Sequence, residues 1–90
     1  MKLCHAIKKR MFRKSRLRNK IDFHHELVLY YQRTQNNILA AMQRTVAEET
    51  LVSIDLKWMR EAAAKSKECA RLCVFHAACV NALTKQINTP

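Results

Sequence analysis

The feature that most restricts the fold of this chain is its lack of glycine: the 90 residues contain none, and the single proline is Pro90. Average usage would give about six glycines and four or five prolines in a chain of this length. Hairpin turns and phosphate-cradling loops depend on glycine, which adopts backbone conformations that other residues avoid. The sequence therefore predicts an all-α fold.

One long helix is predicted between Leu56 and Ile87, where apolar or small residues recur at alternating steps of three and four. This spacing places them on one face of a helix about nine turns long. Because many of them are small, a second helix can approach closely, and the stretch is expected to be half of a helix pair. The predicted seam is Leu56, Met59, Ala63, Ser66, Ala70, Cys73, Ala77, Val80, Thr84 and Ile87.

A preceding helix is expected to start near Asn19 or Asp22, either of which is a suitable N-cap. Its apolar stripe falls out of register with the predicted seam between about residues 47 and 54, where Ser53 is a reasonable cap for the next helix. An antiparallel hairpin with helices at about 22–48 and 54–87 is therefore favoured over one unbroken helix with a stutter. The predicted stripe is Leu27, Tyr31, Thr34, Ile38, Ala41 or Met42, and Thr45.

The hairpin predicts which residues face each other. With a turn near residue 50, the numbers of facing residues sum to about 101, so that Met42 meets Met59 and Ile38 meets Ala63. Large side chains then mostly face small ones, as in a closely packed interface. The same rule puts His25 opposite His76, with His24 beside it.

A further neighbour is expected, because Cys69 to Leu83 is apolar on nearly every side and a two-helix pair buries only one face of each helix. The neighbour is either the N-terminal helix folded back as a third helix, or another chain in a homo-oligomer or larger assembly. Near the turn, Leu51, Ile54 and Trp58 form a second stripe, for which local packing is the simpler explanation. The predicted protein interface is Leu27, Tyr30, Tyr31, Trp58, Leu72, Phe75 and Leu83.

Charge is concentrated at the start of the chain. The formal net charge is +10. Residues 1–20 hold nine Lys or Arg and no acidic residue, whereas the other seventy hold eight basic and seven acidic residues, a net of +1. The chain is therefore predicted to consist of a basic N-terminal arm, residues 1–20, which is helical or becomes ordered on binding, and a near-neutral helical hairpin domain, residues 21–90.

Such an arm attracts phosphate polyanions through Coulomb forces and counterion release, although a merely solvated run of charge is the simplest alternative. Phe12 is too little aromatic surface for base stacking, and no zinc-finger, RNP or recognisable helix-turn-helix motif supports base-specific recognition. The sequence predicts a non-enzymatic protein that binds the backbone of RNA or DNA, as an accessory or structural subunit of a larger nucleoprotein complex. The predicted contacts are Lys8, Lys9, Arg10, Arg13, Lys14, Arg16, Arg18 and Lys20.

An alternative function uses the same arm differently. It is Arg-rich, acid-poor and weakly amphipathic, as are cleavable organelle-targeting peptides and helices that contact anionic membranes. The protein would then be an assembly subunit defined by its protein partner. The longest uncharged run, Leu72 to Thr84, is too short to span a membrane.

A second alternative is a metal-binding bundle, since Cys69, Cys73, His76 and Cys79, with His25 opposite, are candidate ligands of zinc or copper. Over eleven residues the Cys-x3-Cys-x2-His-x2-Cys spacing resembles that of cysteine-rich four-helix copper-storage bundles, which repeat cysteine more densely. Small core residues are the simpler interpretation of these cysteines, and no cofactor is predicted.

No catalytic constellation is recognisable, because Asp22, His24, His25 and Glu26 are adjacent in sequence but point to different sides of a helix. Three of the four cysteines share one helix, where side-chain directions disfavour disulfides. A reducing intracellular compartment is expected: the cytoplasm or nucleoid, or an organelle matrix.

Overall fold

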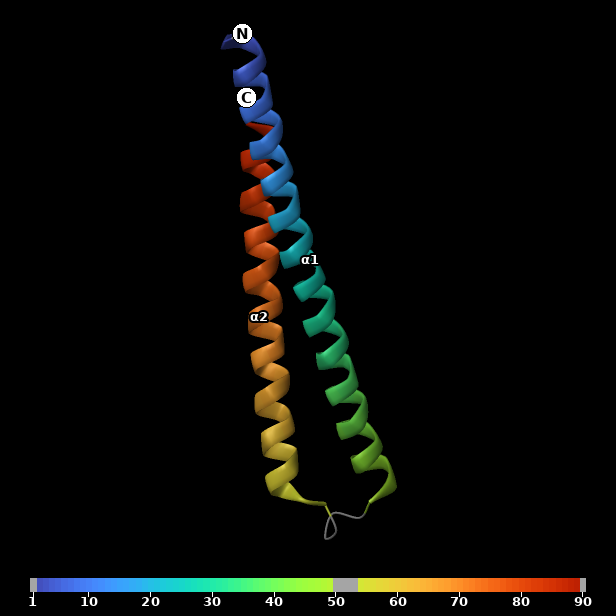
Figure 1. Cartoon of the computed structure of the whole chain (residues 1–90). Coiled ribbons are helices and arrows are strands. Elements are labelled where there is room, and N and C mark those ends of the chain that lie inside the picture. The colour runs from blue at the N-terminus through green and yellow to red at the C-terminus, as the bar shows by residue number, and fades with distance from the viewer. Residues whose placement is uncertain (1, 50–53, 90) are drawn as a thin grey trace.

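The structure, a computed structural model, describes residues 2–49 and 54–89, with the side chains of residues 8–49 and 54–89. Two antiparallel helices, α1 (Lys2–Glu48) and α2 (Leu56–Asn88), lie side by side along a rod measuring 76 × 16 × 14 Å (Figure 1). The described residues contain no strand. The all-α prediction and the antiparallel hairpin are confirmed, and the unbroken helix is ruled out.

The start of the first helix was predicted wrongly. α1 passes without interruption through Asn19 and Asp22, which are exposed positions in its middle, and the basic arm is its first part. Because no glycine or proline lies in this stretch and Lys, Arg and Leu are good helix formers, nothing ends the helix there. The arm extends α1 rather than folding back, so the expected third helix is absent from the described residues.

The cap of α2 is Asp55. Its backbone is extended, and its carboxylate oxygen Oδ1 accepts a hydrogen bond of 3.1 Å from the backbone N–H of Trp58. This satisfies one of the free N–H groups of the first helical turn. The predicted cap, Ser53, and the stripe residue Leu51 lie outside the described residues.

Two matching sets of buried or half-buried residues form the seam between the helices. Each follows steps of three and four, the heptad spacing of paired helices. The set on α1 is Leu17, Ile21, His24, Val28, Tyr31, Gln35, Ile38, Met42 and Thr45. The set on α2 is Met59, Ala62, Ser66, Cys69, Cys73, His76, Val80, Leu83 and Ile87.

Seven of the ten residues of the predicted α2 seam are buried or half-buried, and the other three are exposed. Ala63 and Thr84 are exposed, and Leu56 is 65% exposed, while Ala62 and Leu83 face α1. The local pattern does not distinguish the two registers, because small or apolar residues occupy both members of pairs such as Ala62 and Ala63. On α1, every residue of the predicted stripe is half-buried, which confirms that side of the interface.

The predicted pairing of the helices is confirmed by direct contacts. The Cys73 thiol donates to the Val28 carbonyl over 3.8 Å, and His24 meets His76, so the numbers of facing residues sum to 101 and 100. The interface buries little: among the described residues, only Leu17, Cys69 and Ser66 are buried, and the rest of the seam is half-buried. No helix of the described residues is long and apolar enough to cross a membrane.

Candidate functional site

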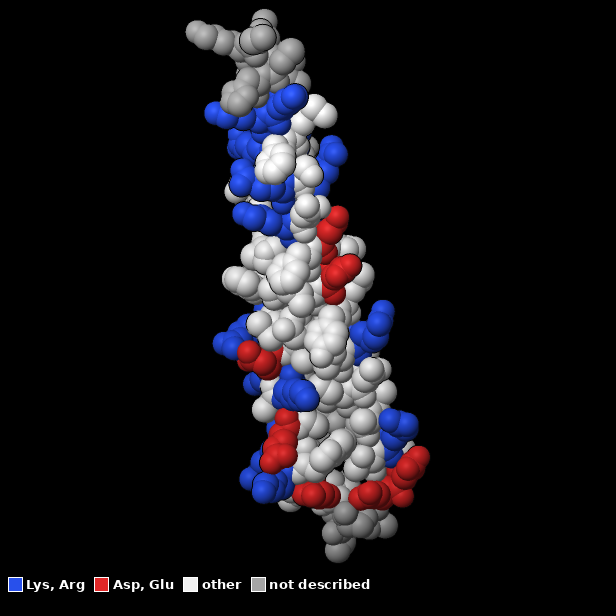
Figure 2. Space-filling model, viewed as in Figure 1, with Lys and Arg blue, Asp and Glu red and all other residues white. Residues whose placement is uncertain are grey.

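The eight predicted nucleic-acid contacts are all exposed on the first part of α1. In Figure 2, blue side chains crowd this end of the molecule, whereas red side chains gather at the other end, where α1 stops and α2 begins. We call the eight residues the basic end. It comprises Lys8, Lys9, Arg10, Arg13, Lys14, Arg16, Arg18 and Lys20.

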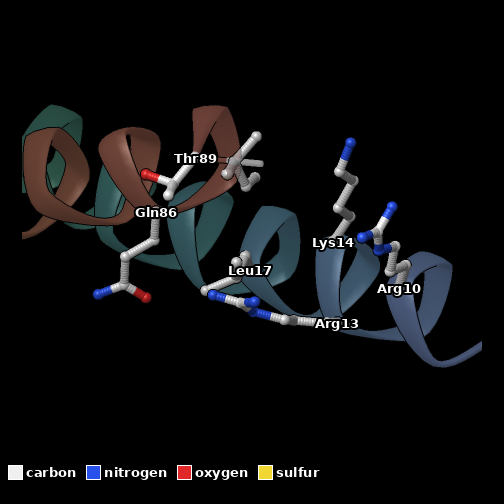
Figure 3. A pocket seen from close by; sticks show the side chains of 7 residues that line it. Arg10, Arg13, Lys14, Leu17, Gln86 and Thr89 are labelled. Carbon is white, nitrogen blue, oxygen red and sulfur yellow. The ribbon is translucent and has the colours of Figure 1, made fainter. Parts of the chain in front are cut away.

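The basic end lies alongside the last turns of α2 and continues past them. Leu17 is 8% exposed and borders the same hollow as Ile87 and Thr89, where α2 ends. In Figure 1, α1 continues past this point. Figure 3 shows Arg10 and Lys14 pointing away from this hollow, while Arg13 runs back toward Leu17. Because facing residue numbers sum to about 100, the end of α2 is level with about residue 12, and Lys8, Lys9 and Arg10 lie past it.

The cations of the basic end are not neutralised by described carboxylates. Among the residues that the structure describes, the one ion pair joins Arg71 to Glu68 over 2.5 Å. There the hydrogen bond and the charge of Glu68 raise the pKa of Arg71. Within the basic end, the Arg16 guanidinium lies 5.6 Å from the centre of the Phe12 ring, a distance at which a cation is attracted to the ring face. This end therefore keeps its positive charge available for an anionic ligand.

The candidate metal ligands do not converge. Cys69 is buried in the seam, the Cys73 thiol is engaged with the Val28 carbonyl, and Cys79 borders a hollow on one side of the helix pair. His25 is exposed, and the residue opposite His76 is His24, one position from the prediction. No group of three or more possible ligands comes together among the described residues.

A cluster of aromatic rings surrounds the histidine pair. The two Nδ1 atoms of His24 and His76 lie 2.9 Å apart, and the Tyr31 ring stacks on His76 with centroids 5.8 Å apart. The rings of Phe23 and Phe75 stand edge-on to the histidine that follows each of them. The sequence placed His24 near His76 but did not predict this cluster. Which rings meet depends on how the two helices are aligned, to within one residue.

Five of the seven predicted interface residues share one side of the rod. In the heptad register of the seam, Leu27, Tyr30, Trp58, Leu72 and Phe75 all occupy the two positions that flank the seam on one side. Phe23 shares this side and borders one hollow together with Cys79 and Ala82 of α2. The other two predicted residues, Tyr31 and Leu83, lie in the seam. We call this side the aromatic face; it comprises Phe23, Leu27, Tyr30, Trp58, Leu72, Phe75, Cys79 and Ala82.

Comparison with known proteins finds no matching family model, curated protein or solved structure. The function is therefore argued from the residues of the basic end and the aromatic face alone.

Proposed function

We propose that this protein binds the sugar–phosphate backbone of RNA or DNA through its basic end, without base-specific recognition, and acts as a non-enzymatic accessory subunit of a nucleoprotein complex. The observation that carries the proposal is the row of eight exposed Lys and Arg residues, uninterrupted by acid, on a helix that extends past its partner.

Geometry supports this assignment. Residues 8–20 of an α-helix span about 18 Å, and duplex DNA carries one phosphate charge per about 1.7 Å of its axis, so the row can meet several phosphates at once. A bare α-helix also fits the major groove of B-form DNA. Arginine presents a planar guanidinium group that can hold phosphate through two hydrogen bonds, and the basic end contains four arginines: Arg10, Arg13, Arg16 and Arg18.

An anionic membrane is the competing ligand for the same charges. Met11 and Phe12 are 67% and 68% exposed, and exposed apolar groups of this kind would enter a lipid surface. They are few beside eight cations that surround the helix on every side, whereas a membrane-surface helix separates its charged and apolar faces. The distribution therefore favours a polyanion that the cations can contact from several sides.

The test compares two variants that each lose four charges. The basic-end variant carries Lys8→Gln, Arg10→Gln, Lys14→Gln and Arg18→Gln. The control variant carries Arg33→Gln, Lys57→Gln, Arg60→Gln and Lys67→Gln, at four exposed positions of the hairpin. Binding to duplex DNA, duplex RNA and vesicles of anionic phospholipid is measured by fluorescence anisotropy or co-sedimentation at one salt concentration.

We expect the basic-end variant to lose at least about 100-fold in affinity for nucleic acid, and the control variant to lose much less. Equal losses in the two variants would mean that total charge, and not the basic end, determines binding. Binding to vesicles but not to either duplex would overturn the proposal in favour of a membrane ligand.

A further inference from the structure

We infer that the aromatic face binds a second copy of this chain, antiparallel to the first, to form a four-helix bundle. This inference concerns self-association, which does not depend on nucleic-acid binding, although four residues of the basic end lie on the same side of α1 as this face. Three observations lead to it: the large exposed area of the single chain, the apolar character of the face, and the distribution of charge along it.

The single hairpin exposes more surface than a chain of its size should. Its accessible surface is 7720 Å², whereas a compact monomer of 10.5 kDa exposes about 5,400 Å². The excess, about 2,300 Å² on this scale, is larger than the roughly 800 Å² that each partner contributes to a standard interface. A second copy can therefore cover an ordinary interface without removing all of the excess.

The aromatic face has the composition of an interface core. Phe23, Tyr30 and Phe75 are between 58% and 60% exposed, which is unusual for rings on a monomer surface. Aromatic residues are enriched in interface centres, where they supply most of the binding free energy. These rings lie near the middle of the rod, because Phe75 lies level with His25, about halfway along α1.

Charge along the aromatic face selects the orientation of the second copy. On this side of α1, four residues of the basic end precede Phe23. They are Lys9, Arg13, Arg16 and Lys20. On the other half of the rod, the same side of α2 carries Glu61 and Glu68 together with Lys65. A parallel partner would bring the two sets of four cations to the same end of the bundle, whereas an antiparallel partner carries them to opposite ends, each at the level of the half of the face that contains the carboxylates.

A two-fold axis at the height of Phe75 fixes which residues of the two copies lie at the same height along the bundle. Glu68 lies seven residues from Phe75, so it comes level with residue 18 of the second copy, between Arg16 and Lys20. Glu61 lies fourteen residues from Phe75 and comes level with residue 11, between Lys9 and Arg13. Both carboxylates therefore fall within the cationic segment of the second copy.

The other half of the basic end stays free. Lys8, Arg10, Lys14 and Arg18 do not lie on the aromatic face. Because the two copies run in opposite directions, these residues are carried to opposite ends of the bundle.

The first experiment measures the mass of the full chain by sedimentation equilibrium without nucleic acid, for the wild type and two adjacent substitutions. Phe75→Glu changes the aromatic face; Val74→Glu, at a residue 71% exposed on the other side of α2, is the matched control. We expect a wild-type dimer, at least about 30-fold weaker dimerisation for Phe75→Glu, and no such loss for Val74→Glu. Circular dichroism checks that both variants remain helical.

A wild-type chain that stays monomeric at about 1 mM would overturn the inference, because even a weak interface assembles at that concentration. So would a trimer or larger oligomer, or equal weakening by the two substitutions.

The second experiment tests the orientation by charge exchange. One variant carries Arg13→Glu and Lys20→Glu, another carries Glu61→Lys and Glu68→Lys, and a third carries all four changes. In the antiparallel dimer, each pair of changes brings charges of one sign to the same end of the bundle, and the combination restores opposite signs at each end. We expect about 10-fold weaker dimerisation for each pair and recovery of most of the loss in the combination. Failure of the combination to recover would contradict the antiparallel arrangement.

Discussion

The Nδ1 atoms of His24 and His76 lie 2.9 Å apart across the two helices, at the centre of the aromatic cluster. A hydrogen bond between two Nδ1 atoms requires one to donate its proton and the other to accept it. Each ring is therefore the hydrogen-bond partner of the other, and the two stabilise the pairing of the helices together.

Loss of one ring should therefore destabilise the hairpin through this pair. We expect His24→Leu or His76→Leu to lower the free energy of unfolding by about 1 kcal/mol, because the remaining half-buried ring loses its hydrogen-bond partner. The double substitution His24→Leu, His76→Leu should cost less than the sum of the two single changes, and His25→Leu, at the exposed neighbouring position, should change stability by less than about 0.5 kcal/mol. Urea unfolding followed by circular dichroism measures all of these variants. Additive costs of the two single changes in the double variant would refute a role for the pair.

The cap of α2 gives a second prediction. Asp55→Ala should lower the free energy of unfolding by about 1 kcal/mol, because the backbone N–H of Trp58 loses its acceptor. Asp22→Ala removes the same side chain from the middle of α1 and should change stability by less than about 0.5 kcal/mol. Thermal or urea unfolding compares the two variants. A larger effect at Asp22 would indicate that α1 does begin there.

The end of the seam gives a third prediction. Leu17→Ala should lower the free energy of unfolding by about 2 kcal/mol, since among the described side chains of α1 this is the first buried one and it packs at the end of α2. Leu29→Ala removes the same atoms from a position that is 46% exposed and should cost less than about 1 kcal/mol. Urea unfolding at one fixed protein concentration is required, because association contributes to apparent stability. Equal costs would show that the helices are not held together at Leu17.

The sequence was sufficient to predict the fold because helix periodicity and the lack of glycine point in the same direction. It also predicted the pairing of the helices, since Val28 meets Cys73 almost as the turn position implies. It failed where two registers were equally apolar, as at Ala62 and Ala63, because only the packing against α1 chooses between them. The helix start at Asp22 failed for another reason: a good cap residue does not end the helix that precedes it.

The candidate site, like the fold, was predicted in part from the sequence. The eight cations of the basic end are as exposed as their sequence suggests, since a charged run has no partner to bury it. The metal site was not supported, because no three candidate ligands come together among the described residues, and His25 is exposed while His24 meets His76. The aromatic face was predicted as a set of residues, but its position on one side of both helices required the register that the structure supplies.

The central claim is that the basic end binds phosphate backbone, and the salt dependence of binding to duplex DNA tests it most directly. If six or more phosphates are contacted, the affinity should fall at least about 10³-fold between about 50 and about 200 mM salt. The slope of log affinity against log salt should be shallower by about 3 to 4 in the variant lacking Lys8, Arg10, Lys14 and Arg18. An affinity that is insensitive to salt, or a slope that these four substitutions leave unchanged, would contradict the claim.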